Sequence, residues 1–291
     1  MRLVCADPVN YDVTLRLDRL PGADQEARTE AEHRGGGGGA ANVATALAAL
    51  GADAAVLGSV GDDDRGRRLR RDLKSAGVDC THLVTAEGRT ASKRLLVDQA
   101  GRIATLGRPG ANEAYDVADL PGESLHRADR LHLTGQAPET ALALADRARA
   151  ADVPVSVDPG RRTGVRDDGS VLARADLVFV NDAEADRLAD PLASAEATVV
   201  VTHGASGAEA RTPGEVVRHP GYEAEVRDPT GAGDAFAAGF LFARGTGASV
   251  RESLAVGNAC GAFAAGRDGA RAGVDRAAVT RRCGADAPSN F

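Results

Sequence analysis

The chain has 291 residues, of which 43% are hydrophobic and 26% charged, with a formal net charge of -7 at pH 7 and four cysteines. A chain of this length and composition can bury one large core, which excludes a small disulfide-stapled module and a largely disordered protein. Because the charge is negative and no long stretch is rich in Lys and Arg, nucleic acid is a poor candidate partner.

The cysteines lie far apart in the sequence, without the close pairs of a zinc site or a redox dithiol. We therefore expect reduced structural thiols. The N-terminus reaches Asp7 and Pro8 too early for a signal peptide, and no apolar run approaches the roughly 18–20 residues of a membrane span. The sequence predicts a cytoplasmic protein with no membrane partner. The four cysteines are Cys5, Cys80, Cys260 and Cys283.

The first part of the chain predicts a strand, a glycine loop and a helix. Residues 3–6 are apolar and end at a turn, which is typical of a buried strand. After five glycines, residues 40–50 have apolar residues at helical spacing, and Gly51 provides a C-cap. A strand over 54–60 and a charged amphipathic helix over 64–76 follow.

From residue 129 onward, predicted strands and helices alternate. Such alternation implies right-handed crossovers and a parallel sheet that helices cover on both faces. The predicted fold class is therefore α/β, with a doubly wound, mostly parallel sheet flanked by helices. The predicted strands are 130–134, 153–157, 176–180 and 198–202, a hairpin occupies 206–226, and the helices are 138–151, 182–189, 233–245 and 249–266.

Two segments, 13–33 and 82–106, do not fit this alternation, so we expect them to form a small β-sheet lid. The second segment has two strand-like runs that turn at Gln99-Ala100-Gly101. The rest of the chain would form the α/β core that binds nucleotide and substrate. That core comprises residues 1–12, 34–81 and 107–291.

The strongest chemical signal is the segment 228–236, Asp-Pro-Thr-Gly-Ala-Gly-Asp-Ala-Phe. Gly231, Ala232 and Gly233 stand just before a predicted helix, so backbone N–H groups can approach an anion without side chains in the way. Asp234 opens that helix, and a carboxylate beside a phosphate site is unfavourable unless it accepts a proton. The alternative is an ordinary turn with Asp234 as the N-cap.

This segment closely resembles the C-terminal signature of the ribokinase-like (PfkB) sugar and nucleoside kinases. The resemblance implies a ribokinase-like fold and transfer of the γ-phosphoryl group of ATP to an acceptor hydroxyl with Mg²⁺. It further implies that Asp234 is the base that takes the hydroxyl proton. The amides of residues 231–234 would form the anion hole for the transferred phosphoryl group.

A second segment, 37–44, reads Gly-Gly-Gly-Ala-Ala-Asn-Val-Ala, which by itself is typical of a flexible linker. It is similar to the N-terminal signature of the same family, in which paired glycines let the backbone approach the sugar and an asparagine binds its hydroxyls. An asparagine and an aspartate after the first strand also resemble the family's sugar site, although an exposed turn carboxylate is the alternative for the aspartate. The implied substrate-binding residues are Asn10, Asp12, Gly37, Gly38 and Asn42.

Two further pairs of residues resemble metal sites of the family. Asn181 and Glu184 match an Asn-x-x-Glu motif that orders Mg²⁺ through water, and magnesium suits this because it keeps several of its waters. A purely structural helix cap is the alternative. Asp228 and Thr230, with the loop 266–270, are similar to the monovalent-cation site described for many relatives, which implies K⁺.

The segment 199–207 is similar to the strand and glycine turn that lies under the nucleotide in this family. We expect His203, within it, to point to solvent or to the backbone. A small-residue helix near residue 258 would border the adenine pocket. The implied nucleotide-binding residues are Thr202, Gly204, Gly207 and Asn258.

The acceptor stays open at this point. A small sugar of the ribose, fructose or ketodeoxygluconate type is the main prediction, and a nucleoside or a phosphosugar such as ribose 1-phosphate is the alternative. The segment 155–162 resembles an Asp-Pro-Asn-x-Arg element of the fructokinase and ketodeoxygluconate-kinase branches, but Gly160 replaces the Asn. A phosphosugar would need cations near the lid, for which the candidates are Lys93, Arg94, Arg108 and Arg161.

The resemblance also implies a homodimer, because relatives often pair such lids. A catalytically silent relative that binds a sugar or nucleotide and regulates a partner is a less favoured alternative, since Asp234 and the glycines before it are intact. A dinucleotide-dependent oxidoreductase would need a glycine fingerprint directly after the first strand. The sequence Asp7-Pro8-Val9-Asn10 is not one.

Overall fold

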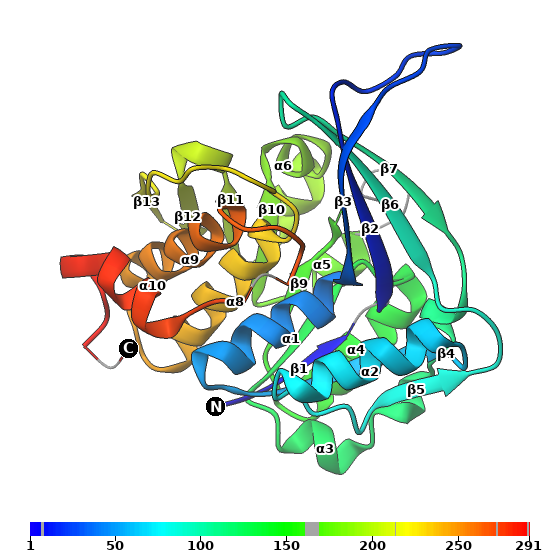
Figure 1. Cartoon of the computed structure of the whole chain (residues 1–291). Helices are drawn as coiled ribbons and strands as arrows, with labels where there is room; N and C mark the ends of the chain where they lie inside the picture. Colours follow the sequence, from blue (N-terminus) through cyan, green and yellow to red (C-terminus); the bar gives the residue numbers. More distant parts are fainter. Residues whose placement is uncertain (7–8, 161–168, 213, 272, 290) are drawn as a thin grey trace.

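The computed structural model describes residues 1–6, 9–160, 169–212, 214–271, 273–289 and 291. These residues form two sheets and the helices around them (Figure 1). A nine-stranded sheet has the order β13-β12-β11-β10-β9-β8-β1-β4-β5, and a four-stranded sheet has the order β3-β2-β6-β7. The predicted doubly wound α/β fold with a small second sheet is confirmed.

All neighbouring strands from β11 to β5 pair in parallel, whereas β12 and β13 are antiparallel, as the predicted hairpin requires. The parallel strands are apolar and buried because helices cover both faces of the sheet. The strands are β1 (Arg2–Ala6), β4 (Asp53–Gly61), β5 (Leu83–Ala86), β8 (Arg130–Thr134), β9 (Val155–Asp158), β10 (Leu177–Asn181), β11 (Thr198–Thr202), β12 (Ala208–Thr212) and β13 (Glu215–His219).

The small sheet, which we call the lid, stands upright beside the core in Figure 1. Its first strand already begins at Asn10, and its second includes the glycines that we expected in a loop, since Gly35–Gly37 pair with Asn10–Asp12. Part of the predicted lid segment 82–106 lies elsewhere, because β5 pairs with β4 in the large sheet. The lid strands are β2 (Asn10–Leu17), β3 (Thr29–Gly37), β6 (Ser92–Asp98) and β7 (Ile103–Arg108).

The long helices agree with the predicted ones. The helix predicted over 182–189 is two short helices that meet at Leu188, and α3, α5 and α10 were not predicted. The helices are α1 (Gly39–Leu50), α2 (Asp64–Ser75), α3 (Gly122–His126), α4 (Pro138–Ala150), α5 (Gly169–Leu172), α6 (Asp182–Arg187), α7 (Ala189–Ser194), α8 (Ala232–Gly245), α9 (Val250–Ala265) and α10 (Arg276–Cys283).

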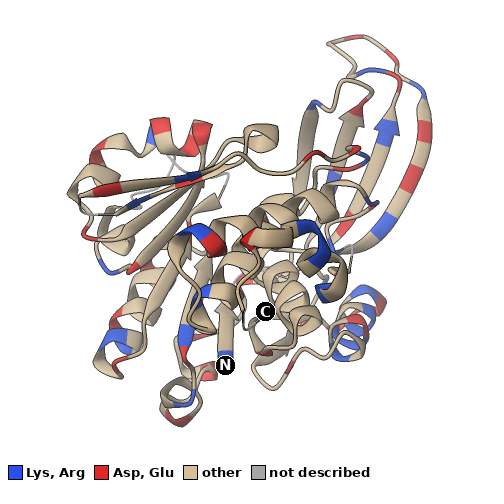
Figure 2. Ribbon diagram, turned by 90° about the vertical axis from the view of Figure 1, so that its left-hand side faces the viewer, with Lys and Arg blue, Asp and Glu red and all other residues tan. Residues whose placement is uncertain are grey.

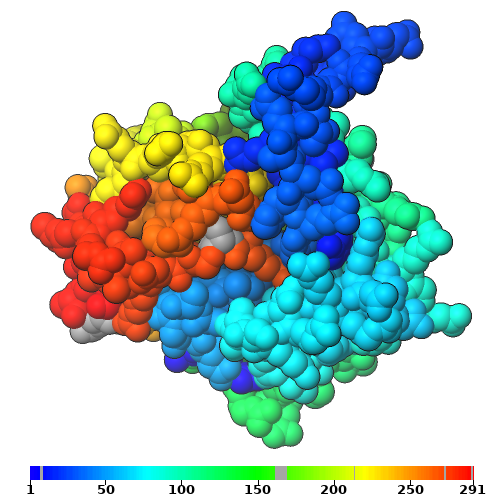
Figure 3. All heavy atoms as spheres, viewed as in Figure 1, coloured from blue at the N-terminus to red at the C-terminus, as the bar shows by residue number. Residues whose placement is uncertain are grey.

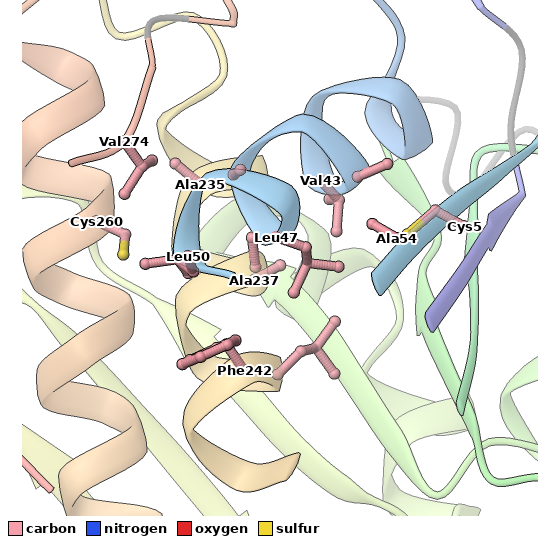
Figure 4. Close-up of a cluster of buried hydrophobic side chains, with 14 of the residues drawn as sticks. Cys5, Val43, Leu47, Leu50, Ala54, Ala235, Ala237, Phe242, Cys260 and Val274 are labelled. Carbon is pink, nitrogen blue, oxygen red and sulfur yellow. The ribbon is translucent and has the colours of Figure 1, made fainter. Parts of the chain in front are cut away.

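Helix α1 lies at the centre of one apolar core, between α8 and the strands β1 and β4 (Figure 4). Val43, Leu47 and Leu50 recur at helical spacing and are almost fully buried. The facing side of α8 is rich in alanine, so the two helices can approach closely. This packing brings the first turn of α1 near the first turn of α8.

All four cysteines are free and buried, as the sequence predicted for structural thiols. Burial raises the pKa of the Cys5 and Cys260 thiols. Acidic and basic residues are interspersed along the helices and the lid (Figure 2). Among the helices of the described ranges, none is both long and apolar enough to cross a membrane.

The α1–α8 contact predicts a large loss of stability for Leu47→Ala. Leu47 is fully buried, so removing its side chain leaves a cavity and should lower the free energy of unfolding by about 2–5 kcal/mol. Urea unfolding followed by circular dichroism measures this. The matched control is Leu106→Ala in the lid, where the side chain is 57% exposed and the change should stay within about 0.5 kcal/mol. If both variants lost the same free energy of unfolding, the proposed importance of the α1–α8 contact for stability would be wrong.

Candidate active site

Helix α8 begins at a glycine that no other residue can replace without strain. Gly231 is the N-cap, with a φ of 80°, and a Cβ there would lie 2.3 Å from the carbonyl oxygen of Ala270. Asp234 is therefore the third residue of the helix, so the alternative of Asp234 as the N-cap is wrong. Around a Cβ placed at Gly233 there is no heavy atom within 4 Å, so the start of α8 faces open space.

The carboxylate of Asp234 is held by Asn42, the residue predicted to bind acceptor hydroxyls. Asn42 Nδ2 donates a hydrogen bond of 2.7 Å to Asp234 Oδ2, although the two residues are 192 positions apart. Asn42 lies in the first turn of α1 and is buried. The two glycine-containing segments of the sequence therefore meet at one point, where α1 and α8 begin.

The lid contributes Asn10 and Asp12 to the same region. Both are buried on β2, so the alternative of Asp12 as an exposed turn carboxylate is wrong. Gly37 lies directly against Asp12, because a Cβ on Gly37 would be 1.9 Å from Asp12 Oδ2. Gly38 follows as the N-cap of α1, with a φ of 99°. These two glycines let the chain pass from lid to core beside the carboxylate.

Sequence reasoning missed one residue of this cluster, Arg271. Its Nε donates to Asn42 Oδ1 (3.1 Å) and its Nη2 to the carbonyl oxygen of Gly37 (2.8 Å). Its Nη1 is buried and has no hydrogen-bond partner among the described residues. Burial lowers the pKa of the Arg271 guanidinium to about 10, which leaves it charged at neutral pH.

Arg271 brings together segments that are far apart in the sequence. In Figure 3 the orange-to-red segment that contains Arg271 lies beside the blue segment where β3 ends and α1 begins. The only sequence signal for Arg271 was its position directly after the loop 266–270. Asp12 and Asp234 both favour the charged form of the guanidinium. The cluster thus contains two carboxylates and one buried cation.

The loop 266–270 lies where the sequence predicted a monovalent-cation site. Asp228 is buried, and its two carboxylate oxygens accept hydrogen bonds from the amides of Thr230 (2.9 Å) and Gly269 (3.1 Å). Thr230 Oγ1 is buried and has no partner among the residues with described positions. A buried, unsatisfied oxygen beside a carboxylate fits the donor set of a hard cation.

Asn181 and Glu184 form a capping box at the start of α6. Asn181 Oδ1 accepts the amide of Glu184 (3.0 Å), and Glu184 Oε2 accepts the amide of Asn181 (3.0 Å). The structural alternative that the sequence left open is therefore present in the fold. Within the described ranges, no three or more His, Cys, Asp and Glu side chains gather in a way that could hold a metal ion directly.

The predicted nucleotide segment lies next to this capping box, since Thr202 at the end of β11 pairs with Asn181 at the end of β10. Gly207 has a φ of 87°, and a Cβ there would lie 2.1 Å from the carbonyl oxygen of His219. The turn that begins at Gly204 therefore packs tightly against the strand β13. Because carboxyl ends of parallel strands share one edge of a sheet, both motifs face the edge where ligands bind in such folds.

Two histidines lie near this edge. His203 is partly exposed, with 29% of its side chain accessible, and its Nδ1 lies 2.6 Å from Asp182 Oδ1. His219 was not singled out in the sequence, yet it is buried and its Nδ1 lies 3.1 Å from Asn258 Nδ2. The amide of Asn258 is therefore anchored to β13. Arg161, a candidate cation for a phosphosugar, lies outside the described residues.

Comparisons with known proteins give the family of the chain. The model of the family described as pfkB family carbohydrate kinase matches residues 1–277. The chain is 49% identical over 286 residues to an ATP-dependent ribose-1-phosphate kinase of Halopiger xanaduensis, with 96% of this chain and 97% of that protein covered. It is 34% identical over 267 residues to a fructokinase of Escherichia coli, which covers 80% of this chain and 87% of that one.

Among solved structures, the chain is similar to a ribokinase of Arabidopsis thaliana in complex with ribose and ATP. The TM-score is 0.83 and the sequence identity 24%, and the match covers 97% of this chain and 98% of the other. At this identity the similarity concerns the fold, which it confirms as ribokinase-like.

Substitution by alanine should destabilise the protein at Gly231 but not at Gly233. Gly231→Ala should lower the free energy of unfolding by about 1–3 kcal/mol, because it combines a positive φ with a clash against Ala270. Gly233→Ala is the matched control, and its stability should stay within about 0.5 kcal/mol because its Cβ meets open space. Urea unfolding of the two variants checks this. If the Gly231→Ala variant were as stable as the control, the backbone at Ala270 would have to move aside at little cost, and the predicted clash would be wrong.

Proposed function

This chain belongs to the pfkB family of carbohydrate kinases, and we propose that its acceptor is a phosphosugar of the ribose 1-phosphate class. It is a phosphotransferase that moves the γ-phosphoryl group of ATP to a hydroxyl of a small sugar. The observation that carries the choice of acceptor is the buried guanidinium of Arg271 among the residues expected to bind the sugar. The name of the 49% identical relative supports the same choice.

In this proposal Asp234 accepts the proton of the acceptor hydroxyl while that oxygen attacks the γ-phosphorus. Asn42 holds the carboxylate through Oδ2 and so fixes which oxygen faces the hydroxyl. The N-terminus of α8 points its amides and its partial positive charge at the same place, where charge spreads over the phosphoryl oxygens. The open space at Gly233 lets the phosphoryl group approach the backbone.

The acceptor would lie between the lid and the start of α1. Asn10, Asp12 and Asn42 offer carboxylate and amide groups to its hydroxyls, beside the close passage at Gly37. A neutral sugar requires no cation there. The positive charge of Arg271, which contacts Asn42 and the carbonyl oxygen of Gly37, favours an acceptor that carries a negative group.

Mg²⁺ and K⁺ complete the proposed reaction. Magnesium, held near Asn181 and Glu184 through water, would neutralise phosphate charge. K⁺ would bind near Asp228, where the unsatisfied Thr230 Oγ1 supports it. Mg²⁺ would stabilise the charge of the phosphates, and K⁺ would stabilise the backbone at the start of α8.

We also propose a homodimer that pairs two lids. The supporting feature is the edge strand β3. Its residues 29–34 are exposed, and no strand of the described residues lies on its outer side. The cytoplasmic location remains a prediction from the sequence.

Asp234→Asn tests the proposed base. The amide keeps the size of the side chain but cannot accept the proton, so kcat should fall by about 10²–10⁴-fold. ATP binding, measured by calorimetry, and thermal stability should stay near wild-type values. ADP release in the presence of Mg²⁺ and K⁺ gives the rate. Turnover near the wild-type level would refute the role of Asp234.

Arg271→Gln tests the acceptor. Loss of a charge-assisted hydrogen bond of about 1.5–3 kcal/mol should raise KM for ribose 1-phosphate by about 10–100-fold. KM for ribose, which carries no charge, should change little. Arg281→Gln on α10 removes the same charge from an exposed position and serves as the control. Initial rates with ribose 1-phosphate, ribose and a nucleoside decide the matter, and a wild-type enzyme that prefers ribose or the nucleoside would overturn the phosphosugar assignment.

A further inference from the structure

A cavity of about 250 Å³ lies outside the cluster of Asp234 and Asn42. Asp63 and Arg65 line it from the start of α2, and Arg89 and Thr90 line it from the connection that leads into β6. Arg108, at the end of β7, completes the wall. The cavity therefore lies where both ends of the β6–β7 hairpin join the lid to the core, and we call it the hinge cavity.

The charges around the hinge cavity are not balanced. Asp63 is its one acidic lining residue, and that carboxylate already accepts hydrogen bonds from the Thr90 hydroxyl (2.6 Å), the Thr90 amide (3.2 Å) and the Gly66 amide (2.9 Å). The side chains of Arg89 and Arg108 form no hydrogen bond or ion pair with any described residue. Arg65 stacks over the Tyr11 ring and also lies close enough to Asp63 for its charge to help lower the pKa of that carboxylate.

Other arginines of this chain have acidic partners, for example Arg67 with Asp64 (2.7 Å) and Arg102 with Asp98 (2.6 Å). Arg65, Arg89 and Arg108 line one cavity, and Arg89 and Arg108 are exposed. An anion bound there would lower the repulsion between their positive charges. Guanidinium groups bind phosphate oxygens through paired N–H donors, which makes arginine the side chain best suited to this oxyanion.

The hinge cavity opens on the face of the lid opposite to the acceptor residues. Neighbouring residues of a strand point to opposite faces, so Tyr11 points away from the face of Asn10 and Asp12. Tyr11 pairs with Ser92, and Ser92 pairs with Arg108, so Tyr11 and Arg108 share one face. The stacking of Arg65 on Tyr11, at 4.9 Å from the ring centroid, places α2 on that face as well.

We propose that the hinge cavity binds a phosphate oxyanion, as inorganic phosphate or as the phosphate group of an effector separate from the acceptor. Such an anion would link Arg65 of the core to Arg89 and Arg108 at the two lid connections. It would thereby hold the lid at one angle to the core. This inference does not depend on which acceptor the enzyme uses, because the site and the acceptor residues lie on different faces of the lid.

Inorganic phosphate titrated into the full-length protein tests the proposal. Calorimetry is done with Mg²⁺ and a non-hydrolysable ATP analogue present, so that the phosphoryl site near Asp234 is filled. We expect one phosphate per chain and at least a tenfold weaker Kd in the double variant Arg89→Gln, Arg108→Gln. The control is Lys74→Gln, Arg281→Gln, which removes two positive charges from exposed positions elsewhere and should bind as the wild type does.

A second measurement locates the anion. Phosphate should slow hydrogen exchange of the amides around residues 89–91 and 108–111 in the wild type and in the control, but not in the double variant. Equal phosphate affinity in the double variant and the wild type, or no binding at millimolar phosphate, would overturn the proposal. Displacement of the phosphate by ribose 1-phosphate would also overturn it, because the cavity would then hold the acceptor's own ester group. None of these measurements uses turnover, so they remain informative if the proposed acceptor is wrong.

Discussion

The contact between helices α1 and α8 is the constraint on which the rest of the structure depends. Each helix begins at a glycine with a positive φ, and each carries one polar side chain in its first turn. Because Leu47 and its neighbours pack against an alanine-rich face, the two helix starts are held at a fixed separation. Asn42 and Asp234 can then form their hydrogen bond without any rearrangement of the two helices. The Asp234 carboxylate therefore has one orientation before any ligand binds.

The fold could be predicted because its periodicities are local. The strand ending at Asn181 and the strand ending at Thr202 are apolar runs between helical patterns, and this alternation determines a parallel sheet. The strand β5 shows the limit of such reasoning, because a four-residue run carries no information about which sheet it joins. Gly35–Gly37 show another limit, since glycine disfavours strands in isolation. Here the absence of side chains is what allows β3 to lie against Asp12.

Within the candidate site, the residues that belong to contiguous motifs could be predicted, and those that arrive from elsewhere could not. Asp234 and Asn42 stand in recognisable glycine-rich segments. Arg271 stands one position after the loop 266–270, and in the sequence nothing distinguishes it from the other arginines of the chain. Only the fold shows that its guanidinium lies against Gly37. The net charge likewise gives no information about local charge. It is -7 for the whole chain, yet three arginines and one aspartate line the hinge cavity.

The buried cysteines have a consequence for handling the protein. A thiol reacts as its thiolate, and burial both raises the pKa of Cys5 and Cys260 and blocks access by reagents. The folded chain should therefore tolerate air and alkylating agents without a protective reductant. Conversely, a cysteine that becomes labelled reports that its part of the core has opened. Since Cys260 lies on α9 and Cys5 on β1, the two sulfurs would report separately on the helical layer and on the central sheet.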